Sequence, residues 1–257
     1  MTKKINFTVT LFYLCLIISW QTVFELKIQP PYVIPSPVMV AERLWELWSD
    51  GYFLPSLKAT LTRMSIGFGM SVVIGLIFGL AMGTSSTINQ SLKSLFLGLQ
   101  TLPTVAWVPI SILIFGVKDN DNGIYFVIVM SSMASVAIST ADGIANIPPL
   151  YLRAAQTLGT SRWAMGWRVI FPAALPSIVT GIKLGWTLGW HGAVSAELIK
   201  GTAGIGFLLH MGRELNDMSQ VVGIMIITIM MGLLLDRFLF GTIERRIRQR
   251  WGLERSH

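Results

Sequence analysis

Long apolar stretches alternate with short polar segments along this chain. Six of them are long enough, or nearly so, to cross a bilayer as a helix, which takes about 20 residues. They run over residues 7–24, 66–82, 92–115, 124–141, 178–199 and 221–240. In lipid each segment must satisfy its own backbone hydrogen bonds, which favours helices, and the period-two alternation typical of a transmembrane barrel is missing. The pattern predicts an all-α, polytopic membrane protein with six transmembrane helices.

The first stretch, residues 7–24, follows Lys3 and Lys4 and so shares features with a signal peptide. No small-x-small cleavage site comes after it, and the chain continues with a charged segment at 25–27. We therefore expect an uncleaved first transmembrane helix.

Composition supports a membrane location. Hydrophobic residues make up 53% of the 257 positions and charged residues only 13%, and the mean hydropathy is +0.62. Soluble domains carry about 25% charged residues. This balance excludes a soluble enzyme and a disordered chain. A single cysteine, Cys15, excludes an intrachain disulfide, and no basic stretch interleaves with aromatic residues as a nucleic-acid site requires.

The distribution of lysine and arginine predicts the orientation. With the N-terminus inside, 13 of these residues fall on the cytoplasmic side and 7 outside, so both termini are expected in the cytoplasm. The tail contributes five arginines: Arg245, Arg246, Arg248, Arg250 and Arg255. Two interpretations of this tail stay open, a binding site for anionic membrane lipids and an ordinary positive-inside anchor.

Two segments are expected on the outer side. Ser36 and Pro37 are a good N-cap and first position for a short amphipathic helix, on which Trp45 and Trp48 would lie at the membrane interface. The polar run 118–123 lacks the glutamate that closes a calcium loop, and we interpret it as an external turn.

The segment 143–177 is too polar and too rich in proline to cross the membrane. A short amphipathic helix is predicted after Pro149, since apolar and small residues recur at helical spacing up to Leu158, and Gly159 supplies a stop. A second helical piece is expected from Ser161, ended by Pro172 and Pro176. A surface of alanines allows another protein to approach closely, so this segment is predicted to dock a cytoplasmic partner.

These residues resemble a known motif. The permease subunits of binding-protein-dependent ABC importers carry a loop of the form Glu-Ala-Ala-x-x-x-Gly-x(9)-Ile-x-Leu-Pro. The matching residues here are Arg153-Ala154-Ala155-Gln156-Thr157-Leu158-Gly159, followed after nine residues by Val169-Ile170-Phe171-Pro172. Further context is similar to the nitrate, sulfonate, taurine and bicarbonate branch: Pro35-Ser36-Pro37, Pro109-Ile110, Pro172-Ala173-Ala174-Leu175-Pro176-Ser177, Ala196-Glu197-Leu198-Ile199 and Gly204-Ile205-Gly206. The resemblance covers roughly residues 35–250.

The resemblance implies the type I permease fold and a division of the chain. Residues 1–35 would hold the N-terminal tip and first helix, 36–245 the permease domain with its coupling loop at 143–177, and 246–257 a basic tail. It further implies that the residues coupling to a cytoplasmic ATPase are Arg153, Ala154, Ala155, Leu158, Gly159 and Pro172, of which Pro172 fixes the return to the membrane. Three positions depart from the motif: Arg153, Val169 and Phe171. Only Arg153 reverses a charge, which removes any ion pair expected of the glutamate.

The resemblance also implies partners. They are a second copy of the permease, two ABC ATPase subunits and an extracytoplasmic binding protein that meets the loops at 25–60 and 200–217, all at a bacterial inner membrane. The chain has no Gly-x-x-x-x-Gly-Lys-Ser/Thr motif, so it is expected to bind no cofactor, with ATP and Mg²⁺ held by the ATPase. The substrate implied is a small anion such as nitrate, a sulfonate or bicarbonate.

Glycines form two stripes with a spacing of four. They comprise Gly75, Gly79 and Gly83 in the second span and Gly181, Gly185 and Gly189 in the fifth. Such stripes let helices approach closely in lipid. Packing within one subunit and sliding at a dimer interface are both compatible with them.

Polar groups inside a membrane are costly and so are functional candidates. We hypothesise that His191, with Trp107, Trp186 and Trp190, lines the path of an anion; the alternative is a histidine packed against a carbonyl. Glu197 is expected near the outer end of its helix with a structural role, paired with Lys200 or Arg213. It lies about 600° around the helix from His191, so the two do not share a face and no metal or acid–base pair is predicted.

Two other classes of membrane protein agree less well with the sequence. A gradient-driven secondary transporter or channel would show broken helices in matching halves, yet Pro103 and Pro109 of the third span have no counterpart in the sixth. An intramembrane enzyme would need a catalytic constellation, and the three histidines match no ligand or catalytic motif, so no catalytic residue and no metal site are expected.

Overall fold

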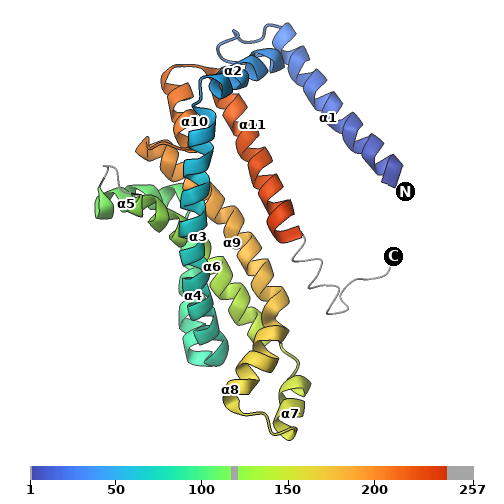
Figure 1. Cartoon of the computed structure of the whole chain (residues 1–257), viewed down its shortest axis with the longest axis vertical. Helices are drawn as coiled ribbons and strands as arrows, with labels where there is room; N and C mark the ends of the chain where they lie inside the picture. Colours follow the sequence, from blue (N-terminus) through green and yellow to red (C-terminus); the bar gives the residue numbers. More distant parts are fainter. Residues whose placement is uncertain (1, 117–120, 242–257) are drawn as a thin grey trace.

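The computed structural model describes residues 2–116 and 121–241, and every regular element within them is a helix (Figure 1). In chain order these are α1 (Thr2–Glu25), α2 (Pro37–Ser49), α3 (Phe53–Thr84), α4 (Ser86–Gln100), the 3₁₀ turn η1 (Thr104–Ala106), α5 (Trp107–Phe115), α6 (Asn122–Ala145), α7 (Pro149–Thr157), α8 (Arg162–Met165), the π-helical η2 (Gly166–Ile170), α9 (Phe171–Lys200), α10 (Ile205–Glu214), α11 (Met218–Leu235) and the π-helical η3 (Asp236–Phe240). The all-helical membrane fold expected from the apolar pattern is confirmed. The expected tail at 246–257 and the first half of the expected turn at 118–123 fall outside the described residues.

Four of the described helices are long and apolar enough to cross a membrane. They are α3, α6, α11 and the continuous helix from Arg162 to Lys200 that contains α9. The third expected span, 92–115, is not one straight helix, because α4 and the η1–α5 segment meet at an angle of 95°. Pro103 lies at this break; it lacks a backbone N–H and disfavours helical geometry in the residue before it. The six-span count is thus consistent with the structure, with one bent span and the shorter apolar part of α1, Thr10–Glu25.

Helix α6 forms the centre of the bundle, between α3 and α9. Both glycine stripes face it. A Cβ atom on Gly79 would lie 2.5 Å from Cβ of Thr140, and one on Gly185 would lie 3.1 Å from the Ser132 carbonyl oxygen, so only glycine fits at this approach. A hydrogen bond from Ser132 to Ser71, 2.7 Å long, joins α6 to α3. The stripes therefore pack helices within one chain, and a second copy has no access to these covered faces.

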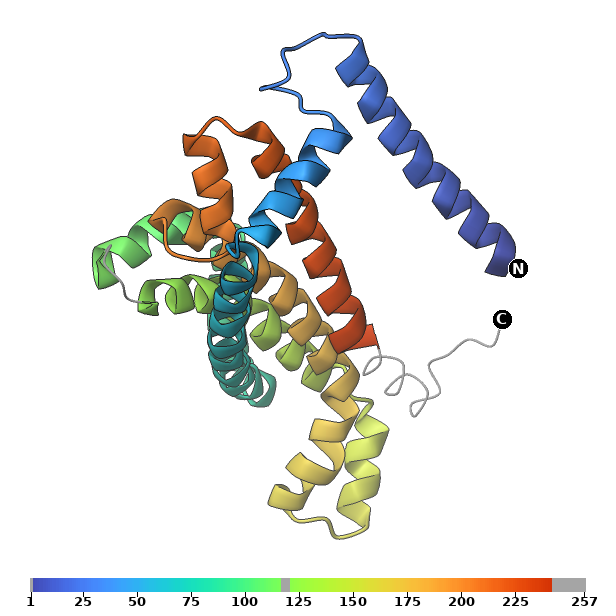
Figure 2. The same ribbon diagram turned by 45° about the horizontal axis from the view of Figure 1, so that its top comes forward.

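Helix α1 stands apart from the bundle (Figure 2). Its contact runs through the segment that leads to α2, where Trp20 Nε1 donates to the Pro35 carbonyl at 3.0 Å. Ser36 accepts from Met39 N at 3.2 Å and so caps α2, as its position in the sequence predicts. Helix α2 packs on α11 with Val40 and Leu47 buried, while Trp45 stays exposed.

The segment after α6 forms a hairpin of α7 and α8 at one end of the molecule (Figure 1). The prediction that Pro172 and Pro176 end its second helix is wrong, because α8, η2 and α9 form one continuous helix. Pro172 lies just after the π-helical η2, an irregular turn within the continuous helix, and Pro176 lies inside α9. At this point α9 packs closely against α6 at Gly143, since a Cβ atom on that glycine would lie 2.6 Å from Cβ of Ser177. Tertiary packing thus overrides the proline signal.

Candidate functional site

Helix α9 presents a polar stripe on its exposed surface. Thr180, Leu184, Thr187 and His191 are all exposed, and their spacing of four, three and four places them on one helix face. Hydroxyl and imidazole groups are unfavourable in hydrocarbon. A spanning helix with such a stripe is therefore suited to an aqueous path or to a polar partner rather than to lipid.

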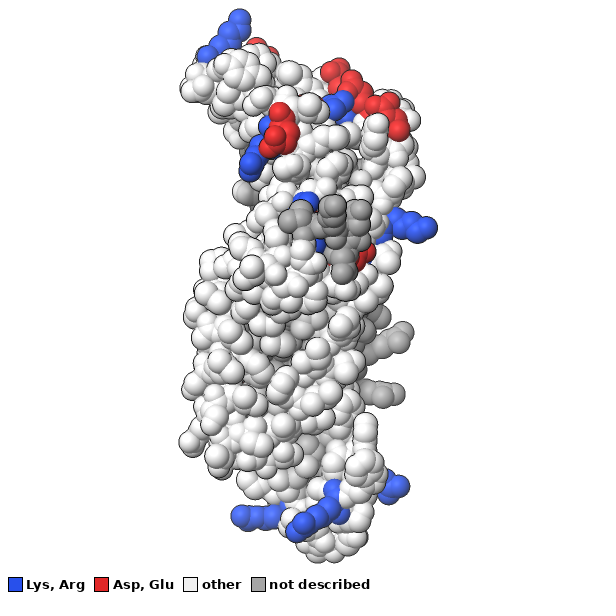
Figure 3. All heavy atoms as spheres, turned by 90° about the vertical axis from the view of Figure 1, so that its left-hand side faces the viewer, with Lys and Arg blue, Asp and Glu red and all other residues white. Residues whose placement is uncertain are grey.

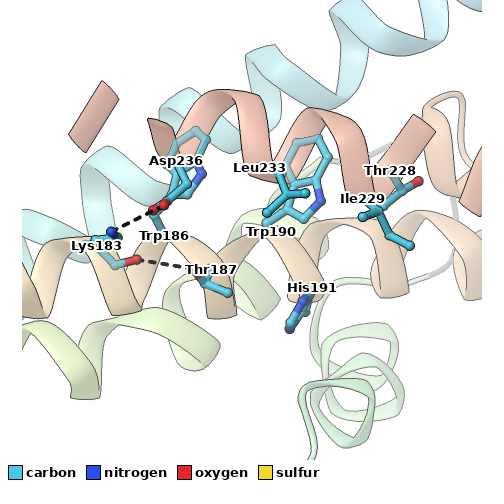
Figure 4. Close-up of a pocket in the computed structure, with 10 residues that line it drawn as sticks. Lys183, Trp186, Thr187, Trp190, His191, Thr228, Ile229, Leu233 and Asp236 are labelled. Carbon is cyan, nitrogen blue, oxygen red and sulfur yellow. Dashed lines mark hydrogen bonds and ion pairs between the residues drawn. The ribbon is translucent and has the colours of Figure 1, made fainter. Parts of the chain in front are cut away.

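A groove of about 360 Å³ runs beside this stripe, between α9 and α11 (Figure 4). Its lining consists of Lys183, Trp186, Thr187, Trp190, His191, Thr228, Ile229, Gly232, Leu233 and Asp236. Three of the four predicted path residues, Trp186, Trp190 and His191, are brought together here. The fourth is not: Trp107, at the start of α5, is buried in the core, where its ring lies 6.2 Å from that of Phe126.

Three buried polar atoms in the groove lack a hydrogen-bond partner among the described residues. They are Nε1 of Trp186, Nε1 of Trp190 and Oδ1 of Asp236. The other carboxylate oxygen of Asp236 lies 3.3 Å from Nζ of Lys183. Buried donors and acceptors without partners are rare in proteins. The groove therefore offers two N–H donors and one oxygen acceptor to a small polar solute or to water.

Lys183 and Asp236 were missed as site residues by sequence reasoning. Lys183 was counted only as a cytoplasmic charge. A signal was present, since Lys183, Trp186 and Trp190 follow a helical spacing of three and four and so share one face. The partner Asp236 follows α11 and reaches this face only through the packing of the two helices.

A second polar cluster lies at the C-terminal end of α9. Glu197 is fully buried, and its carboxylate accepts from Arg63 Nη1 at 3.0 Å and from Thr60 Oγ1 at 2.8 Å. Arg63 also binds Asp121, with Nε 2.8 Å from Oδ1. The prediction that paired Glu197 with Lys200 or Arg213 missed this partner, which lies 134 residues earlier in the chain on α3.

The same cluster holds the start of α10. Gly206 N donates to Glu197 Oε2 at 3.1 Å, and Ile205 N donates to Thr60 Oγ1 at 2.9 Å, so both side chains cap the helix. Gly204 has a φ of +158°, and a Cβ atom on it would collide with the Glu197 carboxylate. The buried Glu197 side chain therefore leaves no room for a side chain at Gly204 or Gly206.

The hairpin of α7 and α8 holds the predicted docking residues. Arg153, Ala154, Leu158 and Gly159 are exposed, and Leu158 is 84% exposed. Gly159 has a φ of +72°, a conformation that glycine adopts without strain. Ala155 was also expected to contact the ATPase, but it is buried within the chain and is not available on the surface.

Large aromatic side chains extend this surface. Trp163 and Trp167 are 79% and 59% exposed and lie with their rings 6.4 Å apart. Within residues 2–116 and 121–241, no three His, Cys, Asp or Glu side chains are grouped closely enough to hold a metal ion. The described part of the chain therefore combines a groove with unpaired polar atoms, a buried polar cluster and an exposed hairpin.

The chain is similar in sequence to known proteins. Residues 71–249 match the family model described as "Binding-protein-dependent transport system inner membrane component". The taurine transport system permease protein TauC of Escherichia coli (strain K12) is 33% identical over 225 residues, which cover 85% of this chain and 81% of that protein. The nitrate import permease protein NrtB of Leptolyngbya laminosa is 33% identical over 220 residues, or 82% and 78% of the two chains. The bicarbonate transport system permease protein CmpB of Synechococcus elongatus is 35% identical over 181 residues, or 70% and 64%.

Proposed function

This chain belongs to the family of inner membrane components of binding-protein-dependent transport systems, and from that premise we propose that it is the permease subunit of an ATP-driven ABC importer for a small anion. It lies in the bacterial inner membrane as a multi-pass protein. It forms the translocation path and carries out no covalent chemistry, while ATP and Mg²⁺ bind to a partner ATPase. The alternative of a gradient-driven transporter has no support from the family.

The observation that carries the proposal is the polar stripe on α9 beside the groove. Thr180, Thr187 and His191 are exposed on a spanning helix. The threonine hydroxyls donate to carbonyls of their own helix, so lipid would penalise mainly the imidazole of His191. Two copies of the chain, with these stripes facing each other, would enclose an aqueous path. The homodimer removes the polar groups from lipid and gives the solute a way across.

The groove suits an anion that must bind weakly and leave again. The indole N–H groups of Trp186 and Trp190 donate hydrogen bonds without a full charge, and the ammonium of Lys183 is already neutralised by Asp236. Sites that conduct must be favourable enough to enter and weak enough to leave. The relatives are named for taurine, nitrate and bicarbonate, three small solutes with an anionic oxygen group, which supports this substrate class.

The hairpin is proposed to receive the ATPase. It lies at the end of the molecule where, on the face shown in Figure 3, Lys and Arg are present without Asp or Glu. By the positive-inside rule this end is cytoplasmic, which agrees with both termini inside. The opposite end, with α2, α10 and the loops beside them, then faces the binding protein.

One helix connects the two ends. Residues Arg162–Lys200 form a single helical rod that begins in the hairpin, passes the groove and ends beside Glu197. Movement of the hairpin with the ATPase would therefore shift Trp186, Trp190 and His191 directly. The π-helical η2, at 166–170, has looser hydrogen bonding and is suited to absorb part of this movement.

Uptake of radiolabelled nitrate, taurine and bicarbonate by the full complex in proteoliposomes tests the proposal. The complex contains the permease, the ATPase and the binding protein of the same transport system. Uptake of one of these anions that requires enclosed ATP supports the proposal, and uptake that persists without ATP overturns it. His191→Ala should lower this uptake at least tenfold, whereas Ser65→Ala, which removes an exposed polar side chain from α3, should not. Unchanged uptake with His191→Ala would remove the stripe from the path.

A further inference from the structure

We infer that the hairpin docks into an acidic cleft of the ATPase, so that charge complementarity selects the correct ATPase for this permease. The inference rests on the proposed function and goes further, because it names the chemistry of the partner surface. We define the docking hairpin as residues 149–168, which comprise α7, the turn at Gly159, α8 and the start of η2.

The first observation is an uncompensated positive charge. Arg153, Arg162 and Arg168 of the docking hairpin are all exposed. The sequence contains no aspartate or glutamate from residue 143 to residue 196. The ion pairs of the described residues lie elsewhere in the structure, as with Lys93 and Asp142 at 2.5 Å. Among residues 2–116 and 121–241, therefore, no ion pair joins any of these three guanidinium groups to a carboxylate.

The second observation is the apolar surface between them. Leu150, Leu158 and Trp163 are 71%, 84% and 79% exposed. Exposed aromatic and aliphatic side chains with arginines around them are typical of the centre and rim of a protein interface. Several large apolar side chains exposed on one short hairpin mark a surface that binds another protein or a membrane.

A protein cleft fits these charges better than a membrane surface does. Figure 1 shows α7 and α8 extending beyond the turn between α3 and α4, away from the spanning helices. In Figure 3 the positive side chains at this end project to both sides. A flat layer of lipid headgroups would meet one side only, whereas a cleft meets both. We therefore assign the charges to the ATPase.

The charge at Arg153 provides specificity for one ATPase over others. In the loop motif that this segment resembles, the same position holds a glutamate, so the charge here is reversed. A cleft with a carboxylate opposite Arg153 would attract this permease and repel one that carries glutamate. Like-charge contacts at an interface cost enough to exclude wrong partners. The position thus becomes a determinant of which ATPase binds.

Copurification under varied salt tests this directly. The tagged full-length permease is purified in nanodiscs with the ATPase of its own transport system, and the amount of ATPase retained is measured from about 50 mM to about 500 mM NaCl, a range that spans strong and weak screening. Retention should fall as salt rises. Arg153→Glu should lower retention at low salt at least tenfold, and Arg153→Gln should give an intermediate loss.

Arg213→Glu is the matched control, because Arg213 is an exposed arginine on α10 at the other end of the molecule. It should leave ATPase retention unchanged. Elution of each variant as a single species in size-exclusion chromatography shows that it is folded. Replacement of the facing carboxylate of the ATPase by arginine should restore binding to Arg153→Glu.

Three results would contradict docking into an acidic cleft. If ATPase is retained equally at all salt concentrations and with Arg153→Glu, the acidic cleft is wrong while the importer assignment stands. If Arg153→Glu abolishes binding to vesicles containing phosphatidylglycerol but leaves ATPase retention intact, the charges serve lipid and the inference is overturned. If the wild-type chain retains no ATPase at any salt concentration, the proposed function fails together with the inference.

Discussion

Arg63 and Glu197 form a buried ion pair that joins the N-terminal part of α3 to the C-terminal end of α9, with Nη1 of the arginine 3.0 Å from Oε1 of the glutamate. The arginine also donates to the Ala203 carbonyl in the turn before α10. The glutamate accepts from Thr60 and from the backbone of α10. One pair of charges thus fixes three helices at the end of the molecule opposite the docking hairpin.

Arg63→Ala should destabilise the chain strongly. It leaves the Glu197 carboxylate buried without its counter-ion, which costs about 3–5 kcal/mol when one partner of a buried pair is removed. Thermal unfolding of the purified protein in nanodiscs measures the effect. Arg213→Ala, which removes an exposed arginine from α10, should change the melting temperature little. Equal melting temperatures for the two variants would contradict the structural importance of the pair.

Gly79→Ala should loosen the contact between α3 and α6. The added Cβ would lie 2.5 Å from Cβ of Thr140, so the helices must move apart at a cost of about 1–3 kcal/mol. Gly69→Ala is the control on the same helix, since no atom lies within 4 Å of its added Cβ. That change should be neutral or slightly stabilising, because alanine favours helix. Chemical unfolding followed by tryptophan fluorescence distinguishes the two, and a loss of stability at Gly69 as large as that at Gly79 would be contrary to the packing described.

Trp190→Phe should impair transport while the fold is retained. The change removes an indole N–H that has no partner among the described residues and keeps an aromatic ring in the groove. The initial rate of ATP-driven uptake should fall several-fold. Trp107→Phe is the matched change in the core, outside the groove, and should leave uptake per folded complex near the wild-type value. If both variants lose transport equally, the groove has no special role.

Insertion of two glycines between Met165 and Gly166 should uncouple the ATPase from the path. The helix from Arg162 to Lys200 would be interrupted between the docking hairpin and the groove. The ATPase should still bind and hydrolyse ATP, but uptake should fall to background. The same insertion after Gly51, in the connection between α2 and α3, tests for a general effect of added length. Uptake that survives the first insertion would exclude the helix as the mechanical connection.

Local features were predictable from the sequence where local physics decides them. The apolar stretches specify spanning helices, because the backbone has no other way to satisfy its hydrogen bonds in lipid. Ser36 caps α2, and Gly159 adopts its positive φ in the turn after α7, because both depend on a few neighbouring residues. The hairpin at 149–168 was predictable as well, because its helices and turn depend on residues that are close together in the sequence.

Prediction was incomplete where distant segments meet. The prolines near α9 were expected to end a helix, yet Pro176 lies inside it, because packing of α6 on Ser177 holds the segment in place. Trp107 was expected to line the path together with Trp190 and His191, but it lies in the core on α5. Glu197 was paired with basic residues close in sequence, while its counter-ion, Arg63, comes from α3.

By itself, the sequence determined that this chain is helical and belongs in a membrane, and it predicted which segment docks a cytoplasmic partner, since apolar length, charge and turn residues act locally. Only the tertiary structure decided that both glycine stripes face α6, that α4 and α5 bend at Pro103 by 95°, and that Lys183, Trp186, Trp190 and Asp236 line one groove. These outcomes depend on which helix lies against which. Several helices with equally apolar faces can pack in many ways in lipid, and close contacts between distant residues select one of them.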